Sequence, residues 1–505
     1  MTRMTRLPLL LRCGAALMLL LAATSCASTP AGLPVHAVPL EARIAAILDA
    51  PPLHRTSWGV LFQDATGRVL FARNPDRHFI PASNTKLVIS VVALGLLGPD
   101  WRYRTEVRAP RLDSAGTVPE LRVIGSGDPT LSARFWGREH AAIAALADSI
   151  VAGGVRRVAG PLVIDVSRFT DMQVNSSWEV GDLPATYAAP ISAFAIEEGG
   201  FAVEVRGGAR AGAGARVAPL IPAGADAGMP AQPLRAVVLT DTAGAATRIS
   251  TDYTARFDTL HLRGTVAAGS TDTVRLSVID PPRFAGRLLA AALADRGVAA
   301  DSVVVRRGPA VVPGGAPDTA GTVLVAALHS PPLADIVAAI LQPSQNWIAE
   351  HVLKTLGAER GAEGTWSAGI ALERAYLADV VGIDSLAVNL RDASGLSAQN
   401  LLTPAAAVRL LVHARNAPWS AQLASALAAP GLRGSTLENR LGGLAGRLQA
   451  KTGTIANVNA LSGYLTTESG RALTFSILSN GSGLPAARVR AAMDTVVVMV
   501  AREVN

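Results

Sequence analysis

The spacing of apolar residues along the 505-residue chain changes several times, and each change indicates a different kind of structure. In residues 57–71, two apolar-rich runs flank the turn-forming residues 64–67, which predicts a β-hairpin. A helix is expected next, because an apolar face recurs after Pro81-Ala82-Ser83, with Ser83 near the start of the helix. Residues 101–279 then alternate short strand-like runs with Gly, Pro, Asp and Thr, which predicts an inserted, largely β region.

Helical periodicity returns after the inserted region. Apolar residues recur at every third or fourth position in residues 284–296, 333–341, 344–356, 371–381 and 404–415. The chain ends with strand-like runs at 460–466 and 472–479 and a helix at 485–504. Because strand-like segments lie at both ends of the chain, we expect an α/β (α+β) fold in which one antiparallel sheet is built from both ends and flanked by helices.

The length bounds the number of domains. One hydrophobic core rarely organises more than about 250–300 residues, so two or three domains are expected. Residues 207–230 are rich in Gly, Ala and Pro and are expected to form an exposed loop.

The first 26 residues have the pattern of an export signal. Three arginines precede an apolar run at residues 13–23, and small residues follow up to Cys26. The run is too short to span a membrane, and no later segment offers about 18 uninterrupted apolar residues. The mature protein is therefore expected outside the cytoplasm, in the periplasm. Either Cys26 is lipidated, since Ala23-Thr24-Ser25 resembles a lipoprotein cleavage site, or ordinary cleavage nearby leaves a soluble protein.

The number and distribution of the basic residues argue against nucleic acid as a partner. The net charge of +7 includes the three signal arginines, which leaves about +4 on the mature chain (7 − 3). No block of about five or six basic residues occurs, which argues against nucleic-acid binding. Both cysteines, Cys13 and Cys26, lie in the signal segment, so the folded part can form no internal disulfide.

Lysine usage directs attention to particular positions. Of 46 basic residues only Lys86, Lys354 and Lys451 are lysines, and the other 43 (46 − 3) are arginines. Arginine does not give up its proton near neutral pH, whereas a buried lysine can, so these lysines are candidates for a chemical role. In Ser83-Asn84-Thr85-Lys86, residues three apart share one helix face, which places the amine beside the hydroxyl it could activate. Read alone, the same four residues could also be a helix cap followed by a solvated lysine.

Two further motifs contain side chains that could act together with Ser83 and Lys86. Lys451-Thr452-Gly453-Thr454 precedes the terminal strand-like runs and offers an amine and two hydroxyls beside a glycine that permits close approach of a substrate. Ser344-Gln345-Asn346 opens a helical segment and offers a hydroxyl and an amide that could relay a proton and hold a substrate amide, although Ser344 could also be an ordinary helix cap.

The order S-x-x-K, S-x-N, K-T-G is the active-site signature of penicillin-binding proteins and serine β-lactamases. Ser83 and Ser344 lie 261 positions apart (344 − 83), far more than in simple members of that superfamily. This spacing resembles the class C low-molecular-mass penicillin-binding proteins, the penicillin-binding protein 4 type. The similarity spans roughly residue 40 to the C-terminus. It is carried further by Gly125-Ser126-Gly127-Asp128-Pro129-Thr130-Leu131, Tyr187-Ala188-Ala189-Pro190, Asp392-Ala393-Ser394-Gly395-Leu396-Ser397 and Leu461-Ser462-Gly463-Tyr464.

The resemblance implies a DD-peptidase/β-lactamase-like transpeptidase fold. Residues 36–100 and 280–505 would form the catalytic domain, and residues 101–279 would form one or two inserted, mostly β domains. The implied activity is that of a serine-type D-Ala-D-Ala carboxypeptidase/DD-endopeptidase acting on peptidoglycan stem peptides, with β-lactams as covalent inhibitors. It implies no cofactor and no metal.

The resemblance also assigns roles to residues. Ser83 would attack the penultimate D-alanine carbonyl, and Lys86 would take its proton. Backbone N–H groups of Ser83 and Thr454 would form the oxyanion hole. Lys451 and Thr452 would hold the terminal carboxylate, while Ser344 and Asn346 would complete the proton path.

This chain departs from the family pattern at several positions. Gln345 replaces a frequent Asp. Family members that read the diaminopimelate side chain use an Asp and an aromatic residue, matched by Asp182 and Tyr187, and also an Arg and a Gln, whose positions carry Ala398 and Ala456 here. Recognition of that side chain is therefore an open question.

Two other functions are compatible with the fold. A serine β-lactamase-like hydrolase would differ in how fast water removes the acyl group, but the chain lacks an acidic deacylation motif of the E-x-x-L-N kind. A catalytically idle cell-wall-binding lipoprotein would keep the fold without the chemistry. The balance between carboxypeptidase and endopeptidase action and the oligomeric state stay open.

Overall fold

The computed structural model describes residues 38–221, 234–254, 259–308 and 319–503. The export signal and Cys26 lie outside the described residues. From Leu40 onward the chain forms one compact unit.

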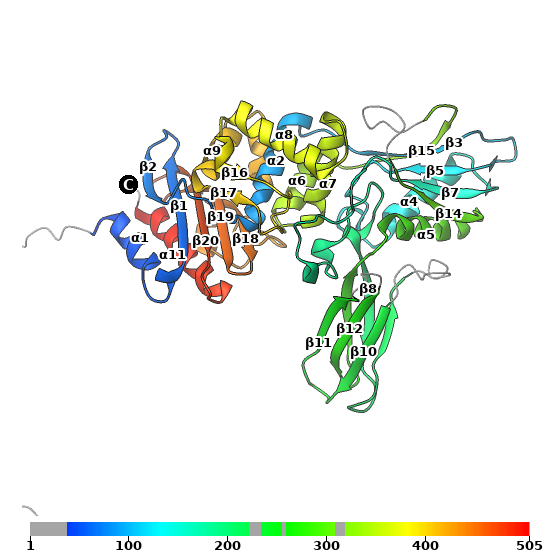
Figure 1. Ribbon diagram of the computed structural model, residues 1–505, viewed down its shortest axis with the longest axis horizontal. Coiled ribbons are helices and arrows are strands. Elements are labelled where there is room, and N and C mark those ends of the chain that lie inside the picture. The colour runs from blue at the N-terminus through cyan, green and yellow to red at the C-terminus, as the bar shows by residue number, and fades with distance from the viewer. Residues whose placement is uncertain (1–37, 222–233, 255–258, 309–318, 504–505) are drawn as a thin grey trace, which may run out of the picture. The chain divides into compact units, whose positions relative to one another are not determined.

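The two ends of the chain build one antiparallel sheet, as predicted (Figure 1). Its strands are, in spatial order, β18 (Leu448–Ile455), β19 (Val458–Thr466), β20 (Ala472–Asn480), β1 (Ser57–Asp64) and β2 (Val69–Arg73). Strand β1 pairs with β20 along its whole length, from Ser57 opposite Asn480 to Asp64 opposite Leu473. The first and last strands of the chain are therefore neighbours.

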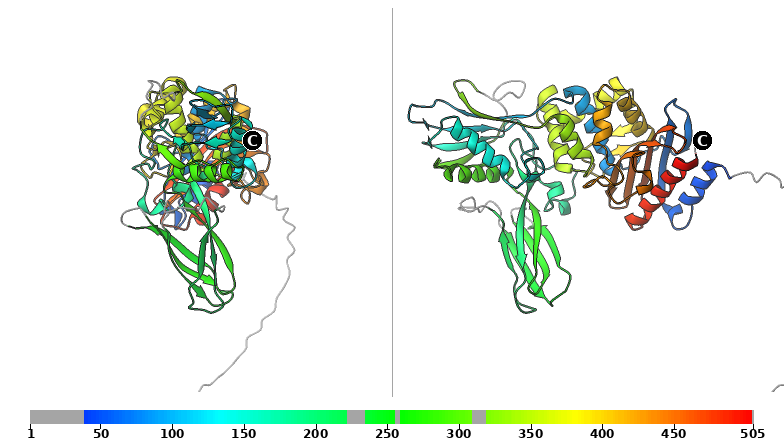
Figure 2. Two further views of the ribbon diagram at one scale, coloured as in Figure 1. Left: turned by 90° about the vertical axis from the view of Figure 1, so that its right-hand side faces the viewer. Right: turned by 180° about the vertical axis from the view of Figure 1, so that it is seen from behind.

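Helices cover both faces of this sheet. Helix α9 (Pro404–Arg415) contacts β20, β1 and β19, whereas α11 (Ala486–Glu503) contacts β19 and packs beside α1 (Leu40–Leu48). Figure 2 shows α11 and α1 side by side along the sheet. Because both faces are covered, β19 and β20 are almost continuously buried, including the serines Ser462, Ser476 and Ser479. In this layer the rings of Phe62 and Phe475 stack with their centroids 5.2 Å apart.

A buried helix carries the chain from the hairpin into the helical layer. One 3₁₀ turn, Ala82–Thr85, leads into α2 (Lys86–Leu97), whose residues from Lys86 to Leu94 are all buried. Helix α2 contacts α9 and three further helices, which are α6 (Leu333–Leu341), α7 (Asn346–Arg360) and α8 (Trp366–Tyr376). Helix α8 continues through one π-helical turn, Leu377–Val381. A helix apolar on all sides is typical of such a central position.

The insertion has its own sheet, with strand order β14-β7-β5-β3-β15. Its strands are β3 (Arg104–Ala109), β5 (Leu121–Ile124), β7 (Pro161–Asp165), β14 (Ser302–Arg306) and β15 (Val323–His329). Helices α4 (Ala141–Ala152) and α5 (Pro281–Ala294) contact each other and this sheet. Strands β14 and β15 and helix α5 lie beyond residue 279, where the sequence suggested that the insertion ends. We therefore propose that the insertion extends to about His329.

The remaining part of the insertion consists of two three-stranded sheets. One has the order β13 (Thr271–Ser277), β8 (Gly200–Arg206) and β9 (Arg216–Pro219). The other has the order β10 (Leu234–Asp241), β12 (Leu260–Ala267) and β11 (Arg248–Tyr253). Strand β9 forms inside residues 207–230, which were expected to be a loop, because it pairs with β8. Residues 222–233 lie outside the described part.

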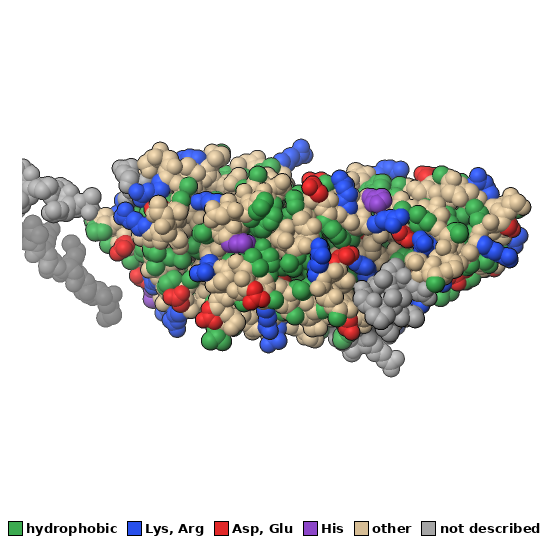
Figure 3. All heavy atoms as spheres, turned by 90° about the horizontal axis from the view of Figure 1, so that it is seen from above, with side chains coloured by type: hydrophobic (Ala, Val, Ile, Leu, Met, Phe, Trp, Pro, Cys, Tyr) green, Lys and Arg blue, Asp and Glu red, His purple; other side chains and the backbone are tan. Residues whose placement is uncertain are grey.

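Short elements connect these layers. They are β4 (Thr117–Val118), β6 (Arg157–Val158), α3 (Ala133–Trp136), β16 (Val388–Asn389), β17 (Leu401–Leu402) and α10 (Ser420–Ala426). Among the described residues, no helix is both long and apolar enough to cross a membrane. On the face that Figure 3 shows, acidic and basic side chains are interspersed.

The tight packing of the main sheet gives a stability prediction. A Cβ added at Gly463 in β19 would lie 2.1 Å from the Gln449 carbonyl oxygen and 2.6 Å from the Ala450 Cα, both backbone atoms of β18. Gly463→Ala is therefore expected to destabilise the protein by about 1–3 kcal/mol, because neighbouring backbone cannot move aside cheaply. The matched control is Gly443→Ala, where a Cβ meets no atom of the described residues within 4 Å. Urea unfolding followed by tryptophan fluorescence measures both, and equal midpoints for the two variants would contradict the prediction.

Candidate active site

The turn before α2 places Ser83 beside Lys86. Ser83 is partly exposed, whereas the Lys86 side chain is completely buried. The distance from Lys86 Nζ to Ser83 Oγ is 3.0 Å. The predicted contact between the hydroxyl and the amine is present.

Lys86 Nζ has two further partners from distant segments. It donates to Asn346 Oδ1 at 2.7 Å and to the Ser394 carbonyl oxygen at 2.6 Å. Burial lowers the pKa of Lys86 to about 7, and the negative charges of Asp392 and Glu350 limit that decrease. Near neutral pH the neutral amine is thus well populated and can accept a proton from Ser83.

The middle motif joins the site at the start of α7. Ser344 has a φ of +66°, a left-handed conformation that is unfavourable for a residue with a side chain and typical of functional sites. Gln345, not Ser344, caps the helix, because its side chain accepts a hydrogen bond from the Trp347 N–H. The Ser344 hydroxyl is therefore not occupied by capping. Asn346 Nδ2 donates to the Tyr187 carbonyl oxygen at 3.0 Å.

Strand β18 supplies the third motif. Lys451 is completely buried, and its Nζ donates to Ser344 Oγ and to the Thr452 carbonyl oxygen, each at 2.8 Å. Burial, and secondarily the positive charge of Lys86, hold the pKa of Lys451 well below its usual range. Thr452 Oγ1 donates to Thr436 Oγ1 at 2.8 Å. Lys451 thus contacts the Ser344 hydroxyl from strand β18.

Gly453 allows β18 to pack against the nucleophile turn. A Cβ at this position would lie 2.9 Å from the Pro81 carbonyl oxygen and 3.1 Å from the Ser83 nitrogen. The sequence suggested that the glycine makes room for a substrate. In the structure it makes room for the chain's own turn, which Asn84 Nδ2 also ties to the Lys451 carbonyl oxygen at 3.2 Å.

A cavity of about 460 Å³ opens above these groups. It is lined by Ile80, Ser83, Glu179, Asp182, Tyr187, Ser344, Asn346, Gly395, Leu396, Ala398, Thr454, Ile455, Ala456 and Val458. Asp182 and Tyr187, which come from the insertion, therefore share the cavity with Ser83, and the Tyr187 hydroxyl donates to Asp182 Oδ1 at 2.7 Å. Ala398 and Ala456 line it as well. The described lining contains two carboxylates and no lysine or arginine.

Three residues of this neighbourhood were not among the predicted site residues. They are Glu350 and Asp392, whose charges act on Lys86, and Ser394, whose carbonyl accepts from it. Glu350 could have been suspected, because it lies four positions after Asn346 and residues four apart share a helix face. Asp392 and Ser394 were noted only as part of a matching stretch.

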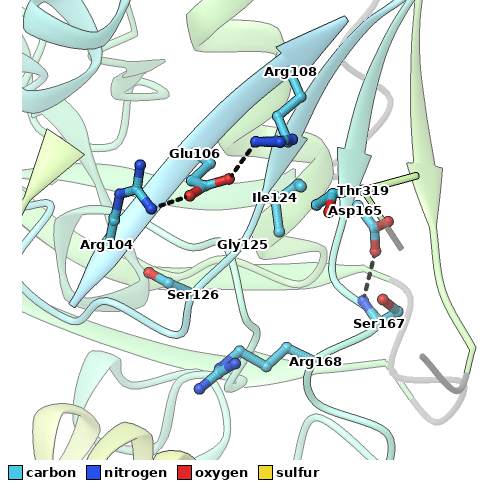
Figure 4. A pocket seen from close by; sticks show the side chains of 10 residues that line it. All are labelled: Arg104, Glu106, Arg108, Ile124, Gly125, Ser126, Asp165, Ser167, Arg168 and Thr319. Carbon is cyan, nitrogen blue, oxygen red and sulfur yellow. Dashed lines mark hydrogen bonds and ion pairs between the residues drawn. The ribbon is translucent and has the colours of Figure 1, made fainter. Parts of the chain in front are cut away.

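A second cavity, of about 470 Å³, lies in the insertion (Figure 4). Its charged side chains are already paired. Arg104 and Arg108 both contact Glu106, and Arg168 pairs with Glu359. Asp165 accepts from the Ser167 N–H and lies 3.4 Å from Arg306. The cavity around Ser83 is therefore the better candidate for chemistry.

Comparisons with known proteins show which family this chain is similar to. Residues 40–503 match the model of the D-Ala-D-Ala carboxypeptidase 3 (S13) family. A D-alanyl-D-alanine carboxypeptidase of Actinomadura sp. (strain R39) is 34% identical over 467 residues, which cover 88% of this chain and 82% of that protein. Carboxypeptidase DacB of Mycolicibacterium smegmatis is 28% identical, with 88% and 80% covered. The crystal structure of penicillin binding protein 4 from Haemophilus influenzae superposes with a TM-score of 0.76 at 20% identity, covering 90% of this chain and 98% of that one.

The contact between Ser83 and Lys86 predicts selective reactivity. Ser83 is expected to react with a fluorophosphonate probe, and Lys86→Met is expected to slow labelling about 10²- to 10⁴-fold, because a positioned base contributes that much. Ser90→Ala is the matched control, since Ser90 is a buried serine of the same helix as Lys86 and its hydroxyl has no partner in the described part of the chain. Gel-based labelling kinetics measure the rates. Equal labelling of Lys86→Met and Ser90→Ala would contradict the role of the amine.

Proposed function

The chain belongs to the D-Ala-D-Ala carboxypeptidase (S13) family, and we propose that Ser83 is the nucleophile with which it cleaves the D-Ala-D-Ala end of peptidoglycan stem peptides. As a member of this family it is a serine-type D-Ala-D-Ala carboxypeptidase/DD-endopeptidase with a penicillin-binding protein 4-like fold. One observation carries the proposal: the buried Lys86 amine lies 3.0 Å from Ser83 Oγ and has its own N–H groups directed to two other acceptors.

In the acylation step, Ser83 Oγ attacks the carbonyl carbon of the penultimate D-alanine, and Lys86 Nζ takes the hydroxyl proton. The peptide C–N bond then breaks. The Ser344 hydroxyl, which Lys451 holds at 2.8 Å, gives its proton to the leaving amine of the terminal D-alanine and takes up the proton that Lys86 received from Ser83, so that Lys86 is neutral again. The peptide is left as an ester on Ser83.

The oxyanion of the transition state and the terminal carboxylate of the substrate are both negative, and each needs its own hydrogen-bond donors or positive charge. Backbone N–H groups of Ser83 and Thr454 stabilise the oxyanion in this proposal. Thr454 lines the cavity and contacts the terminal carboxylate. Thr452 instead stabilises the strand through its hydrogen bond to Thr436. Lys451 supplies positive charge, because a bound carboxylate favours its protonated form.

In the second step, water attacks the ester carbon. Lys86 accepts a proton from that water and returns it to Ser83 Oγ as the ester bond breaks. The shortened peptide leaves and the enzyme is restored. The same two steps cleave a cross-linked peptide when the leaving amine belongs to a second stem.

The lining of the cavity suggests a preference among stem peptides. Asp182 and Glu179 are carboxylates without a cationic neighbour on the described wall, and Ala398 and Ala456 leave space beside them. We therefore propose that Asp182 and Tyr187 favour a stem side chain that ends in a free ammonium group, and that a carboxylate on that side chain gains no ion pair.

The proposed location and inhibitors follow from the family. The structure of the Haemophilus influenzae relative has also been determined in complex with a β-lactam. We propose that β-lactams acylate Ser83 here too. The export signal in residues 1–26 supports a location outside the cytoplasm, and lipidation of Cys26 would add an anchor.

The function is tested by intact-mass analysis with benzylpenicillin and by D-alanine release from a stem pentapeptide. We expect one adduct on the wild type and none on Ser83→Ala. Because Lys86 acts as a base with a pKa of about 7, the acylation rate should rise as the pH increases through 7 and fall as Lys86 is protonated below it. Sustained fast hydrolysis of nitrocefin would instead identify a β-lactamase, and the absence of any adduct would favour an idle wall-binding protein.

The side-chain preference has its own test. Asp182→Asn should lower kcat/KM about 10-fold for a stem peptide ending in a free side-chain amine, because one ion pair in a partly buried site is lost, at about 1.4 kcal/mol per tenfold. The same peptide with an acetylated side-chain amine should be cleaved equally by wild type and variant. An equal decrease of kcat/KM for both peptides would show that Asp182 does not recognise the side-chain amine.

A further inference from the structure

Glu350 is a buried carboxylate one helical turn beyond Asn346 in α7. Its Oε1 accepts hydrogen bonds from the Ser394 N–H at 2.7 Å and from the Ala393 N–H at 3.2 Å. Its Oε2 accepts from Trp366 Nε1 at 2.7 Å. Three N–H donors thus converge on one carboxylate, and two of them belong to the same short backbone segment.

That segment also contacts Lys86. The Ser394 residue that donates its N–H to Glu350 accepts a hydrogen bond from Lys86 Nζ at its carbonyl oxygen, at 2.6 Å. The position of this carbonyl oxygen therefore depends on the carboxylate of Glu350. No direct hydrogen bond joins Glu350 to Lys86 among the described residues.

The base has a geometric requirement that these contacts meet. A neutral amine has two N–H groups and one lone pair. Asn346 Oδ1 and the Ser394 carbonyl oxygen accept the two N–H groups, so the lone pair is directed at Ser83 Oγ, 3.0 Å away. Without a fixed Ser394 carbonyl, the amine could rotate and donate an N–H to Ser83, which would block proton transfer in the required direction.

Asp392 holds the same segment from its other side. It accepts from the Gly395 N–H at 2.9 Å, the Ser397 N–H at 2.7 Å and Asn400 Nδ2 at 2.7 Å. The segment is therefore held between two carboxylates, of which only Glu350 receives the N–H of Ser394 itself.

We propose that Glu350 is a positioning residue for the Lys86 base, acting through the Ser394 carbonyl that it holds in place. The inference rests on the proposed function, in which Lys86 is the base for Ser83. Glu350 touches neither substrate nor the reacting atoms. Its charge has a second effect, because a negative group near Lys86 stabilises the ammonium form.

The charged groups around Lys86 come from several elements. Glu350 faces it from α7, Asp392 from the segment after β16, and Lys451 from β18. Glu373 of α8 interacts with Glu350 and Asp392, and burial and their negative charges raise its pKa well above the usual range. Both Glu373 oxygens are buried without a hydrogen-bond partner among the described residues, which favours the neutral form of this carboxyl.

The experiment compares two isosteric variants of buried carboxyls. Glu350→Gln keeps the shape but removes the charge and one acceptor, and it is expected to lower the benzylpenicillin acylation rate about 100-fold, the loss typical of a misplaced reacting group. KM for the stem peptide should change little. Burial, and secondarily the negative charge of Asp392, raise the pKa of Glu350 itself to about 7, the range in which Lys86 titrates. Glu350→Gln leaves Lys86 to titrate without this partner, so the acid limb of the rate against pH should move to lower pH, because the carboxylate form of Glu350 no longer stabilises the ammonium. Glu373→Gln, which puts a neutral amide in place of a carboxyl whose neutral form is favoured, should keep the wild-type rate and pH profile.

Each outcome decides the question. A folded Glu350→Gln protein that acylates at the wild-type rate overturns the proposal. So does a slower variant whose rate falls at the same acid pH as in the wild type, because a merely structural role of Glu350 would leave that pH unchanged. Should Glu350→Gln fail to fold, Glu350→Asp keeps the charge on a shorter side chain and must slow acylation without moving the limb. An unchanged Glu350→Asp rate overturns the proposal. Absence of acylation in the wild type is a different result, because it would reject the proposed function itself.

Discussion

The burial of the Lys86 amine is the constraint on which the rest of the site depends. A completely buried lysine is tolerable only if it is largely neutral or well supplied with acceptors, and here both conditions hold. Its three contacts come from the turn before α2, from the start of α7 and from the segment around Ser394. These parts of the chain cannot separate without leaving the amine unsatisfied. The chemistry and the packing of three elements are therefore fixed by one side chain.

Much of this arrangement could be predicted from the sequence, and the parts that could not have a common cause. The hairpin, the terminal sheet and Ser83 with Lys86 follow from local periodicity or from residues three apart. The helical spacing from Asn346 could have pointed to Glu350, but its contact with Ser394 could not be predicted, because it joins positions 44 apart in sequence. The proposed longer insertion could not be predicted for the same reason, since β14 pairs in parallel with β7, far earlier in the chain. Helix α5 before it has an ordinary helical pattern that does not reveal which sheet it covers.

Side-chain contacts, and not only the chain connections, join the insertion to the catalytic part. Trp178 of the insertion donates to Asp392 at 3.0 Å, and Trp366, which donates to Glu350, packs edge-on against Trp178. Lys354, the third lysine of the chain, is buried on α7, pairs with Asp171 of the insertion and lies 4.2 Å from the centre of the Trp366 ring. The insertion thus contributes both to the wall of the cavity, through Asp182 and Tyr187, and to the packing behind it.

The pairing of β1 with β20 also sets an order of events for the newly made chain. Among the described strands, only β20 lies beside the first hairpin on the β1 side, so the sheet next to the turn that holds Ser83 cannot be completed before residues 472–480 have been synthesised. The sheet of the insertion needs no strand beyond β15 and can assemble earlier. A chain that lacks its last strands would have neither the neighbour of β1 nor Lys451, so it is expected to have no hydrolytic activity.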